Sequence, residues 1–224
     1  MAQVFLNRRT AGRTLADALL HLAGPETVVL GLPRGGLPVA DEVARLLKAP
    51  LDIVLVRKIG MPGNPELALG AIAGPDGKNR FINAELARLS GIGAASIEAQ
   101  AAPQRAELER RSKLWGAGLP QGALKGKQVI LVDDGIATGA TMQVAIAAVR
   151  ADHPIRVVVA TPVAAPDAAE RIAQLADEMV CLVKPAAFSA VGRHYENFPQ
   201  LADDDVRTIL TAARARLAPS KPMP

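Results

Sequence analysis

Short apolar runs rich in β-branched residues alternate along this chain with segments of helical periodicity, and this alternation restricts the possible folds more than any other feature. The strand-like runs are Thr27–Leu32, Leu51–Val56, Val129–Asp133, Arg156–Thr161 and Met179–Val183. Runs that are apolar on both faces form a sheet that helices must cover from both sides. The chain is therefore predicted to have an α/β fold with a parallel sheet between two helical layers.

Helical patterns occupy most of the intervals between these runs. In one of them Leu37, Ala40 and Val43 fall on a single helical face. The expected helices are Leu37–Leu47, Ala84–Leu89, Ala94–Trp115, a segment ending near Arg150, Asp167–Leu175 and Asp203–Leu217.

The domain organisation follows from the absence of repeats and linkers in the 224-residue sequence. We expect one domain over residues 1–224 with a core at about 27–198. Arg57–Gly77 and Ala94–Gly126 do not fit the alternation and are interpreted as insertions. The Pro-, Ser- and Lys-rich tail at 218–224 is expected to be disordered.

Composition and charge limit the kinds of ligand and partner that the protein can be expected to bind. The net charge of +4 suits small anionic ligands but is too small to indicate DNA, and an aromatic content of 3% argues against stacking on nucleic acid bases. The single cysteine, Cys181, excludes a disulfide framework and a multi-cysteine metal site. No apolar run approaches the roughly 20 residues of a membrane helix, and no signal peptide is visible. We expect a cytoplasmic protein that binds neither nucleic acid nor membranes.

The segment Val129–Met142 carries the strongest chemical signal. An apolar strand ends in two adjacent acids, Asp133 and Asp134, and a turn of small residues leads into a helix. The N–H groups and hydroxyls at that helix start form a cradle for an anion. Carboxylates beside such a cradle can accept hydrogen bonds from a sugar diol, so the segment predicts a sugar-phosphate site. A plain strand–turn–helix with a threonine N-cap explains the threonines but not the two acids.

This segment resembles the phosphoribosyl pyrophosphate (PRPP) binding motif of the type I phosphoribosyltransferases. That motif has an apolar strand, two acids, two small or apolar residues, one variable residue and Thr-Gly-x-Thr. The resemblance extends from about Thr27 to Phe198, favours an uncharacterised bacterial branch, and implies a three-layer α/β/α fold with a flap loop and a C-terminal hood.

The resemblance also implies roles for individual residues. Asp133 and Asp134 would orient the ribose hydroxyls and touch Mg²⁺ through water, and Ala137–Thr141 would hold the 5-phosphate. The substrate-binding residues implied by this motif are Asp133, Asp134, Gly135, Ile136, Ala137, Thr138, Gly139, Ala140 and Thr141. Ala137 stands where family members that act on 6-oxopurines usually carry an aspartate, which weighs against such a base.

A second loop, Gly31–Gly36 (GLPRGG), follows the first strand. It matches neither a Walker A loop nor a dinucleotide-binding fingerprint. It offers the guanidinium of Arg34 and the N–H groups of Gly35 and Gly36 to an anion. By resemblance these groups would contact the pyrophosphate of PRPP.

Two further segments match parts of the family pattern. Arg57 and Lys58 precede the flap and would bind pyrophosphate, with Lys58 grouped with the two acids as catalytic. Glu66 is interpreted as a solvated loop residue or as a flap acid or base. Phe188 lies in the hood, where it would either stack on a base or pack the hood against the core. His194 is a weaker candidate, and the general acid or base stays open.

These features predict an enzyme that transfers the 5-phosphoribosyl group between PRPP and a nitrogenous base, in nucleotide metabolism, with release of pyrophosphate and with Mg²⁺ as cofactor. The alternative is a non-catalytic regulator that binds PRPP or a nucleotide on the same fold. A phosphatase is disfavoured because the two aspartates are adjacent rather than in an Asp-x-Asp pattern. Family precedent favours a homodimer, and the acceptor base stays open.

Overall fold

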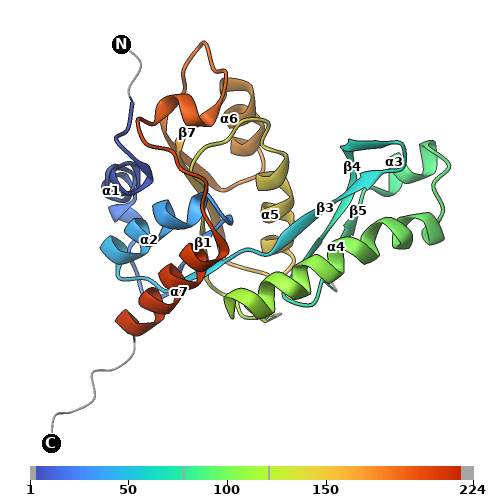
Figure 1. Cartoon of the computed structure of the whole chain (residues 1–224), viewed down its shortest axis with the longest axis horizontal. Helices are drawn as coiled ribbons and strands as arrows, with labels where there is room; N and C mark the ends of the chain where they lie inside the picture. Colours follow the sequence, from blue (N-terminus) through green and yellow to red (C-terminus); the bar gives the residue numbers. More distant parts are fainter. Residues whose placement is uncertain (1–3, 78, 121, 218–224) are drawn as a thin grey trace, which may run out of the picture.

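A five-stranded parallel sheet forms the centre of the molecule (Figure 1). The computed structural model describes residues 4–77, 79–120 and 122–217. In spatial order the strands are β2 (Leu51–Ile53), β1 (Thr27–Gly31), β6 (Gln128–Val132), β7 (Arg156–Val163) and β8 (Glu178–Val183). All four pairings are parallel, which confirms the sheet predicted from the apolar runs.

The register of β1 and β6 brings their carboxyl ends together. Gly31 pairs with Val132, and the N–H of Leu32 donates to the Val132 carbonyl at 2.8 Å. The loop that follows each strand therefore starts at the same edge of the sheet, where parallel α/β proteins bind their ligands.

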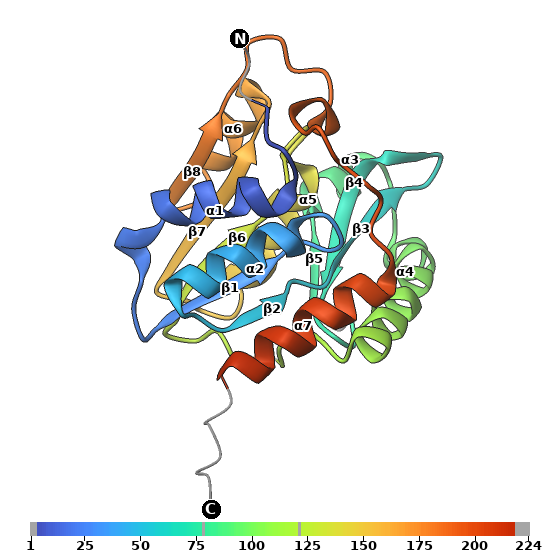
Figure 2. The same cartoon turned by 60° about the vertical axis from the view of Figure 1, so that its left-hand side comes forward.

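Helices cover both faces of the sheet (Figures 1 and 2). One face carries α1 (Arg8–Ala18), η1 (Leu20–Leu22) and α2 (Gly36–Leu47), with α7 (Asp203–Leu217) packed beside α2. The other face carries α5 (Ala140–Arg150) and α6 (Pro166–Ala173). Along β6, Ile130 and Val132 pack into the first layer while Val129 and Leu131 pack into the second, as the two-residue period of a strand requires.

Residues 56–115 form a lobe beside the central sheet. Its antiparallel sheet contains β3 (Val56–Met61), β4 (Asn64–Ala73) and β5 (Asn79–Ile82). The helices α3 (Ala84–Leu89) and α4 (Ala94–Trp115) complete the lobe, and α4 packs against β3. The segment expected to be a flap loop is thus mostly a hairpin, whose strands the sequence hid because glycine and proline interrupt the apolar alternation.

Helix α1 was not among the expected elements. Asn7 accepts from the Thr10 N–H at 3.0 Å, and the Thr10 hydroxyl accepts from the Asn7 N–H at 3.0 Å, so the two residues form a reciprocal cap. Leu15 of α1 and Leu210 of α7 both belong to the main hydrophobic cluster, although they lie outside the segment 27–198. The tail at 218–224 lies outside the described residues.

The chain before α1 runs beside the segment that follows the short helix η2 (Val191–His194). Phe5 forms a parallel bridge with Tyr195, and its N–H donates to the His194 carbonyl at 2.9 Å. The N–H of Asn197 donates to the Leu6 carbonyl at 3.0 Å. Residues near both ends of the described chain thereby meet above the carboxyl edge of the sheet.

Candidate functional site

The loop after β6 is held by main-chain hydrogen bonds that its N–H groups donate to the neighbouring strand β7. The N–H of Asp133 donates to the Ala160 carbonyl at 3.3 Å, and the N–H of Ile136 donates to the Val163 carbonyl at 2.9 Å. The Asp133 carboxyl accepts from the Asp134 N–H at 2.9 Å. The two acids are thereby fixed at the carboxyl edge of the sheet.

The loop then turns into α5 through Gly139, whose φ of +76° favours glycine. Ala137, Thr138 and Thr141 are exposed at this turn, so the helix start faces solvent. The N–H groups of a first helical turn have no partner within the helix and attract anions. The loop and α5 together form an open anion cradle next to the acids.

Asp134 is held by contacts from two segments that are distant in sequence. Its residue is 8% exposed, and the Nε of Arg8 lies 2.7 Å from its Oδ2. The Tyr195 hydroxyl donates to the Asp134 carbonyl at 2.6 Å. Asp133, the preceding residue, is half-buried.

The surroundings shift the pKa values of these groups. Burial, and then the charge of Asp134, raise the pKa of Asp133 well above its ordinary value. Burial also raises the pKa of Asp134, while the hydrogen bond from Arg8 opposes that shift. Burial raises the pKa of Tyr195, so its hydroxyl remains a donor to Asp134.

The loop after β1 lies directly against the acids. A Cβ on Gly35 would stand 2.2 Å from Asp134 Oδ2, and a Cβ on Gly36 would stand 2.6 Å from the Val132 carbonyl oxygen. The peptide between Pro33 and Arg34 is cis. Only glycine allows this close approach of the loop to the acids. The Gly36 N–H is already used within the loop, because it donates to the Leu32 carbonyl at 3.0 Å.

Arg34 faces the segment that leads into α7. Its guanidinium donates to the Leu201 carbonyl at 2.7 Å and lies 3.3 Å from the carboxylate of Asp203. The guanidinium predicted to bind pyrophosphate is thus engaged by the protein's own chain.

The two basic residues of β3 lie on opposite faces of the lobe sheet. Arg57 donates to the Gln104 side chain of α4 at 2.8 Å, and burial lowers its pKa. Lys58 lies on the face shared with Val56, which packs in the cluster around α5. Lys58 therefore lies on the face of the lobe sheet that is directed toward the cluster around α5, and Arg57 lies on the opposite face, against α4.

The hood segment contains a stacked pair. The rings of Phe188 and His194 are 5.7 Å apart at an interplanar angle of 15°. His194 is buried, and its Nδ1 has no hydrogen-bond partner among the described residues. Phe188 is half-buried and packs against the cluster around Tyr195, which fits the interpretation that it packs the hood.

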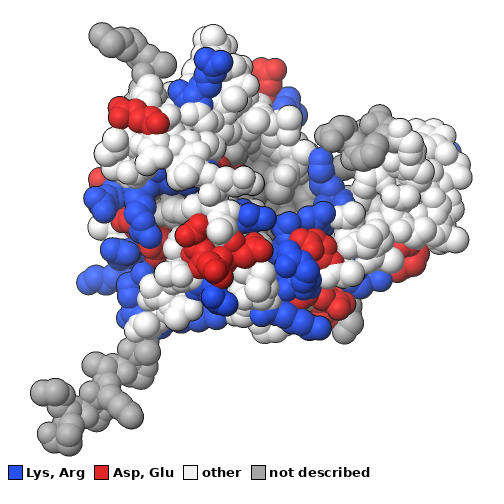
Figure 3. Space-filling view, viewed as in Figure 1, with Lys and Arg blue, Asp and Glu red and all other residues white. Residues whose placement is uncertain are grey.

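The surface near the site is hollowed. Arg8, Arg34 and Gly35 line a hollow of about 400 Å³ together with residues 198–201. Figure 3 shows a recess between the core and the lobe, with Lys and Arg side chains at its border. The hollow of Arg8 and Arg34 therefore reaches Gly35 of the loop after β1.

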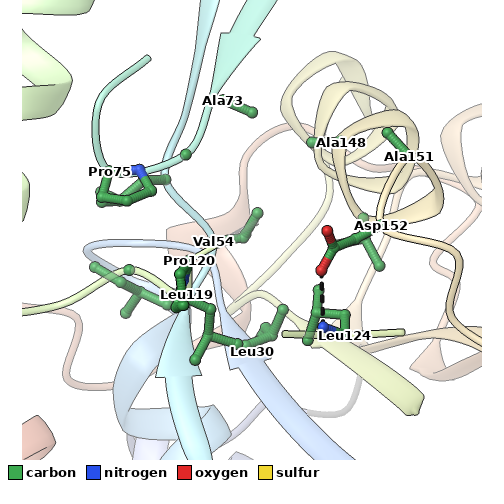
Figure 4. Close-up of a pocket in the computed structure, with 15 residues that line it drawn as sticks. Leu30, Val54, Ala73, Pro75, Leu119, Pro120, Leu124, Ala148, Ala151 and Asp152 are labelled. Carbon is green, nitrogen blue, oxygen red and sulfur yellow. Dashed lines mark hydrogen bonds between the residues drawn. The ribbon is translucent and has the colours of Figure 1, made fainter. Parts of the chain in front are cut away.

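A smaller cavity of about 80 Å³ lies at the other end of α5 (Figure 4). It is lined mostly by apolar residues, such as Leu30, Val54 and Leu119. Its carboxylate, Asp152, accepts from the N–H groups of Gly122 and Leu124. Because that carboxylate is already engaged and the two acids after β6 do not line the cavity, it is not the candidate site.

The site combines sequence-predicted residues with two that the sequence analysis did not identify. The predicted acids, cradle and glycine loop come together. Arg8 and Tyr195 were missed because they are distant in sequence from the motif, and only the Asn7 cap signals that a helix begins near Arg8.

A parallel α/β sheet with acids, a glycine loop and a helix start at its carboxyl edge defines a class of proteins that bind phosphate-bearing ligands there. The chain belongs to the phosphoribosyltransferase family, because the model of the phosphoribosyl transferase domain matches residues 6–196. Its parallel sheet with helices on both faces is the three-layer arrangement expected from the resemblance. The resemblance drawn from the motif is thereby confirmed.

Individual relatives agree with this assignment. A putative phosphoribosyl transferase of Mycobacterium tuberculosis, in strains CDC 1551 and H37Rv, is 47% identical over 216 residues, which cover 96% of this chain. The alignment covers 48% of that relative, so the chain spans about half its length. The crystal structure of TT1426 from Thermus thermophilus is 47% identical, with a TM-score of 0.84 over 94% of this chain and 99% of that one.

Two kinds of feature are absent from the described residues. No helix there is long and apolar enough to cross a membrane. No group of three or more His, Cys, Asp or Glu side chains in those ranges is arranged to hold a metal ion.

Proposed function

We propose that this protein is a phosphoribosyltransferase that uses PRPP and transfers its 5-phosphoribosyl group to a nitrogenous base. The observation that carries the proposal is the juxtaposition of Asp133 and Asp134 with the exposed start of α5 and the glycine loop after β1. A diol on the acids and a phosphate on the helix start match the two ends of a ribose 5-phosphate.

In the proposed reaction the bond between ribose C1 and the pyrophosphate oxygen breaks, and a bond from C1 to the acceptor nitrogen forms. The pyrophosphate leaves with the electron pair, and the acceptor nitrogen loses its proton. The protein's contribution is to position the reactants and to stabilise the charge on the leaving group. Lys58 and the N–H group of Gly35 are proposed to stabilise that charge, since the Gly36 N–H donates to the Leu32 carbonyl.

The donor set fits Mg²⁺. This ion is typically held by one or two carboxylates together with substrate phosphates and water, and it needs no cage of protein ligands. Asp133 would hold it through water, because the carboxylate of Asp134 is already paired with Arg8. The ion would neutralise charge on the pyrophosphate.

The acceptor is proposed to be a base without a 6-oxo group. Ala137 is exposed at the cradle and its methyl group can accept no proton from a base nitrogen. Base recognition is assigned to the hood around Phe188. A cytoplasmic location, a role in nucleotide metabolism and a homodimer belong to the same proposal.

A second candidate function is a non-catalytic regulator that binds PRPP or a nucleotide. The observation in its favour is that Arg34 is engaged by Leu201 and Asp203 while Arg57 is turned toward α4. Two of the cations predicted to bind pyrophosphate are thereby directed elsewhere.

Calorimetric titration of PRPP with Mg²⁺ into the full chain tests the proposal, with the double variant Asp133→Asn/Asp134→Asn as control. Saturable binding that the double variant loses supports the sugar-phosphate site, and no binding at millimolar PRPP overturns it. A panel of bases is then assayed for pyrophosphate release. Release with one base supports the enzyme, whereas binding without release for every base supports the regulator.

A further inference from the structure

The guanidinium of Arg8 contacts a carboxylate, a main-chain carbonyl and an aromatic ring. Its Nε lies 2.7 Å from Asp134 Oδ2, and its Nη1 donates to the Pro199 carbonyl at 2.8 Å. Its guanidinium carbon lies 3.7 Å from the centroid of the Phe198 ring. Arginine suits this combination because its planar fork binds a carboxylate while its face stacks on an aromatic ring.

The carboxylate of Asp134 is confined on its other sides as well. A Cβ on Gly35 would stand 2.2 Å from Oδ2 and 2.7 Å from Cγ, so the loop after β1 lies against the carboxylate. The Tyr195 hydroxyl fixes the carbonyl of Asp134. The carboxylate therefore lies between a guanidinium and a backbone loop and has little room to rotate.

The ion pair joins residues 126 positions apart, and both side chains are about nine-tenths buried. A buried ion pair contributes little net stability, because desolvation of both charges offsets their attraction. Replacing a buried ion pair by apolar side chains of similar volume often leaves the free energy of unfolding unchanged or raises it. The pair is therefore better explained by the placement of Asp134 than by stability.

We infer that Arg8 is a positioning residue of the sugar-phosphate site and acts through Asp134. The inference rests on the proposed function for the identity of the ligand. Arg8 holds the second acid of the motif in a fixed orientation and compensates its charge. An anionic ligand at the cradle is then close to one acid without a cationic partner, Asp133, rather than to two.

The test compares Arg8→Met and Arg8→Lys with the matched control Arg9→Met in the full chain. Arg9 is the next residue of α1, and its guanidinium pairs with Asp41 and Glu42 instead of Asp134. Three measurements are made: PRPP affinity by calorimetry with Mg²⁺, hydrogen exchange of the amides at 133–136 without ligand, and melting temperature.

Arg8→Met is expected to weaken PRPP affinity by about tenfold or more, because truncating one partner of a buried charge pair releases the other. Arg8→Lys is expected to lose about threefold, since an ammonium cannot reach both Asp134 and Pro199. If pyrophosphate release is observed, KM for PRPP is expected to rise more than kcat falls. Arg9→Met is expected to keep the wild-type affinity even where its melting temperature falls.

Exchange at 133–136 is expected to be faster in both Arg8 variants than in Arg9→Met. Equal exchange in all variants overturns the inference, whether or not PRPP binds, and so does an unchanged PRPP affinity in the Arg8 variants. If wild type binds no PRPP, the proposed function fails, while hydrogen exchange still decides the role of Arg8. If Arg8→Met does not fold, Arg8→Lys provides the same comparison.

Discussion

Asp134 shows how one residue can belong to a ligand site and to the scaffold at once. Its side chain pairs with Arg8, its carbonyl accepts from Tyr195, and its carboxylate touches the backbone of Gly35. Asp133, one position earlier, is half-buried and makes fewer of these contacts. The two acids of the motif are therefore inequivalent, which the sequence pattern alone does not indicate.

At this scale we predict that Gly35→Ala disturbs the acids. The new Cβ would stand 2.2 Å from Asp134 Oδ2, so the loop or the carboxylate must move. We expect the free energy of unfolding to fall by about 1–3 kcal/mol, as for other overpacked sites. PRPP affinity, measured by calorimetry, is expected to fall with it.

Gly24→Ala is the control for this substitution. The nearest atom to a Cβ at position 24 is Thr27 Oγ1 at 3.8 Å, an ordinary contact. Unchanged stability and affinity in both variants would show that the close approach at Gly35 is not required.

At the scale of elements, α4 shows how a helix can be stabilised at its surface. Its buried residues include Ala101, Leu108 and Trp115, which pack against β3 and α7. On its outer side Glu107 pairs with Arg110 at 2.7 Å and Arg111 at 2.6 Å. The helix was predicted with the correct bounds, because a 22-residue segment with charges at these spacings is typical of a helix.

The Glu107 pairs predict a pH dependence of stability. The hydrogen bond from Arg110, with that from Arg111, lowers the pKa of Glu107 from 4.5 to about 2. A carboxyl with a lowered pKa in the folded state stabilises the protein fully above its unfolded pKa. That contribution is lost as the pH falls toward the folded value. Because these pairs lie at the surface, we expect no more than about 1 kcal/mol.

Urea denaturation of Glu107→Gln and wild type at neutral and acidic pH measures this contribution. The two free energies of unfolding are expected to differ most at neutral pH and to converge as the pH falls from about 4.5 toward 2. Glu109→Gln on the same helix is the control, since Glu109 forms no salt bridge within the described residues. A difference that does not depend on pH would contradict the assignment.

The elements that the sequence did not predict have a common physical reason. Helix α1 has a low apolar content, because its buried face contains one large apolar residue, Leu15, beside alanine and glycine, and the Asn7–Thr10 cap marks its start. Strands β3 and β4 are interrupted by glycine and proline, and they are specified by pairing with each other and by packing against α4 and α5. The central strands were predicted because each is a nearly continuous apolar run.

At the scale of the whole molecule, two chain crossings join the lobe to the central sheet. The first is Val54–Leu55 after β2, and the second follows Gly116 at the end of α4. The N–H of Gly118 donates to Asp52 at 3.2 Å, so the crossings lie side by side. The small cavity of Figure 4 is lined by both crossings.

Asp152 holds the second crossing to the end of α5, and we predict that Asp152→Ala loosens it. The substitution removes the acceptor for the N–H groups of Gly122 and Leu124. We expect a loss of about 1–3 kcal/mol and faster limited proteolysis between α4 and β6. Asp17→Ala on the exposed side of α1 is the control, and equal proteolysis of the two variants would contradict the prediction.

The candidate site contains residues from distant parts of the chain, and the sequence motif does not include all of them. The predicted acids, cradle and glycine loop lie within two short segments, and parallel pairing of β1 and β6 brings them together. Arg8 and Tyr195 come from segments 126 and 61 residues from Asp134, so only tertiary packing reveals them. Their contribution could not be read from local patterns.

The pairing of Phe5 with Tyr195 has a practical consequence for handling the protein. Phe5 and Leu6 hydrogen-bond to residues 194–197, and Arg8 follows at once with its contact to Asp134. An affinity tag or fusion partner joined just ahead of Val4 would be attached to the segment that leads into Arg8, whereas the end of α7 lies on the other side of the core from the amino end (Figure 1). Assays are best performed with the tag at the carboxyl end or after its removal, because a crowded amino end can imitate an inactive protein.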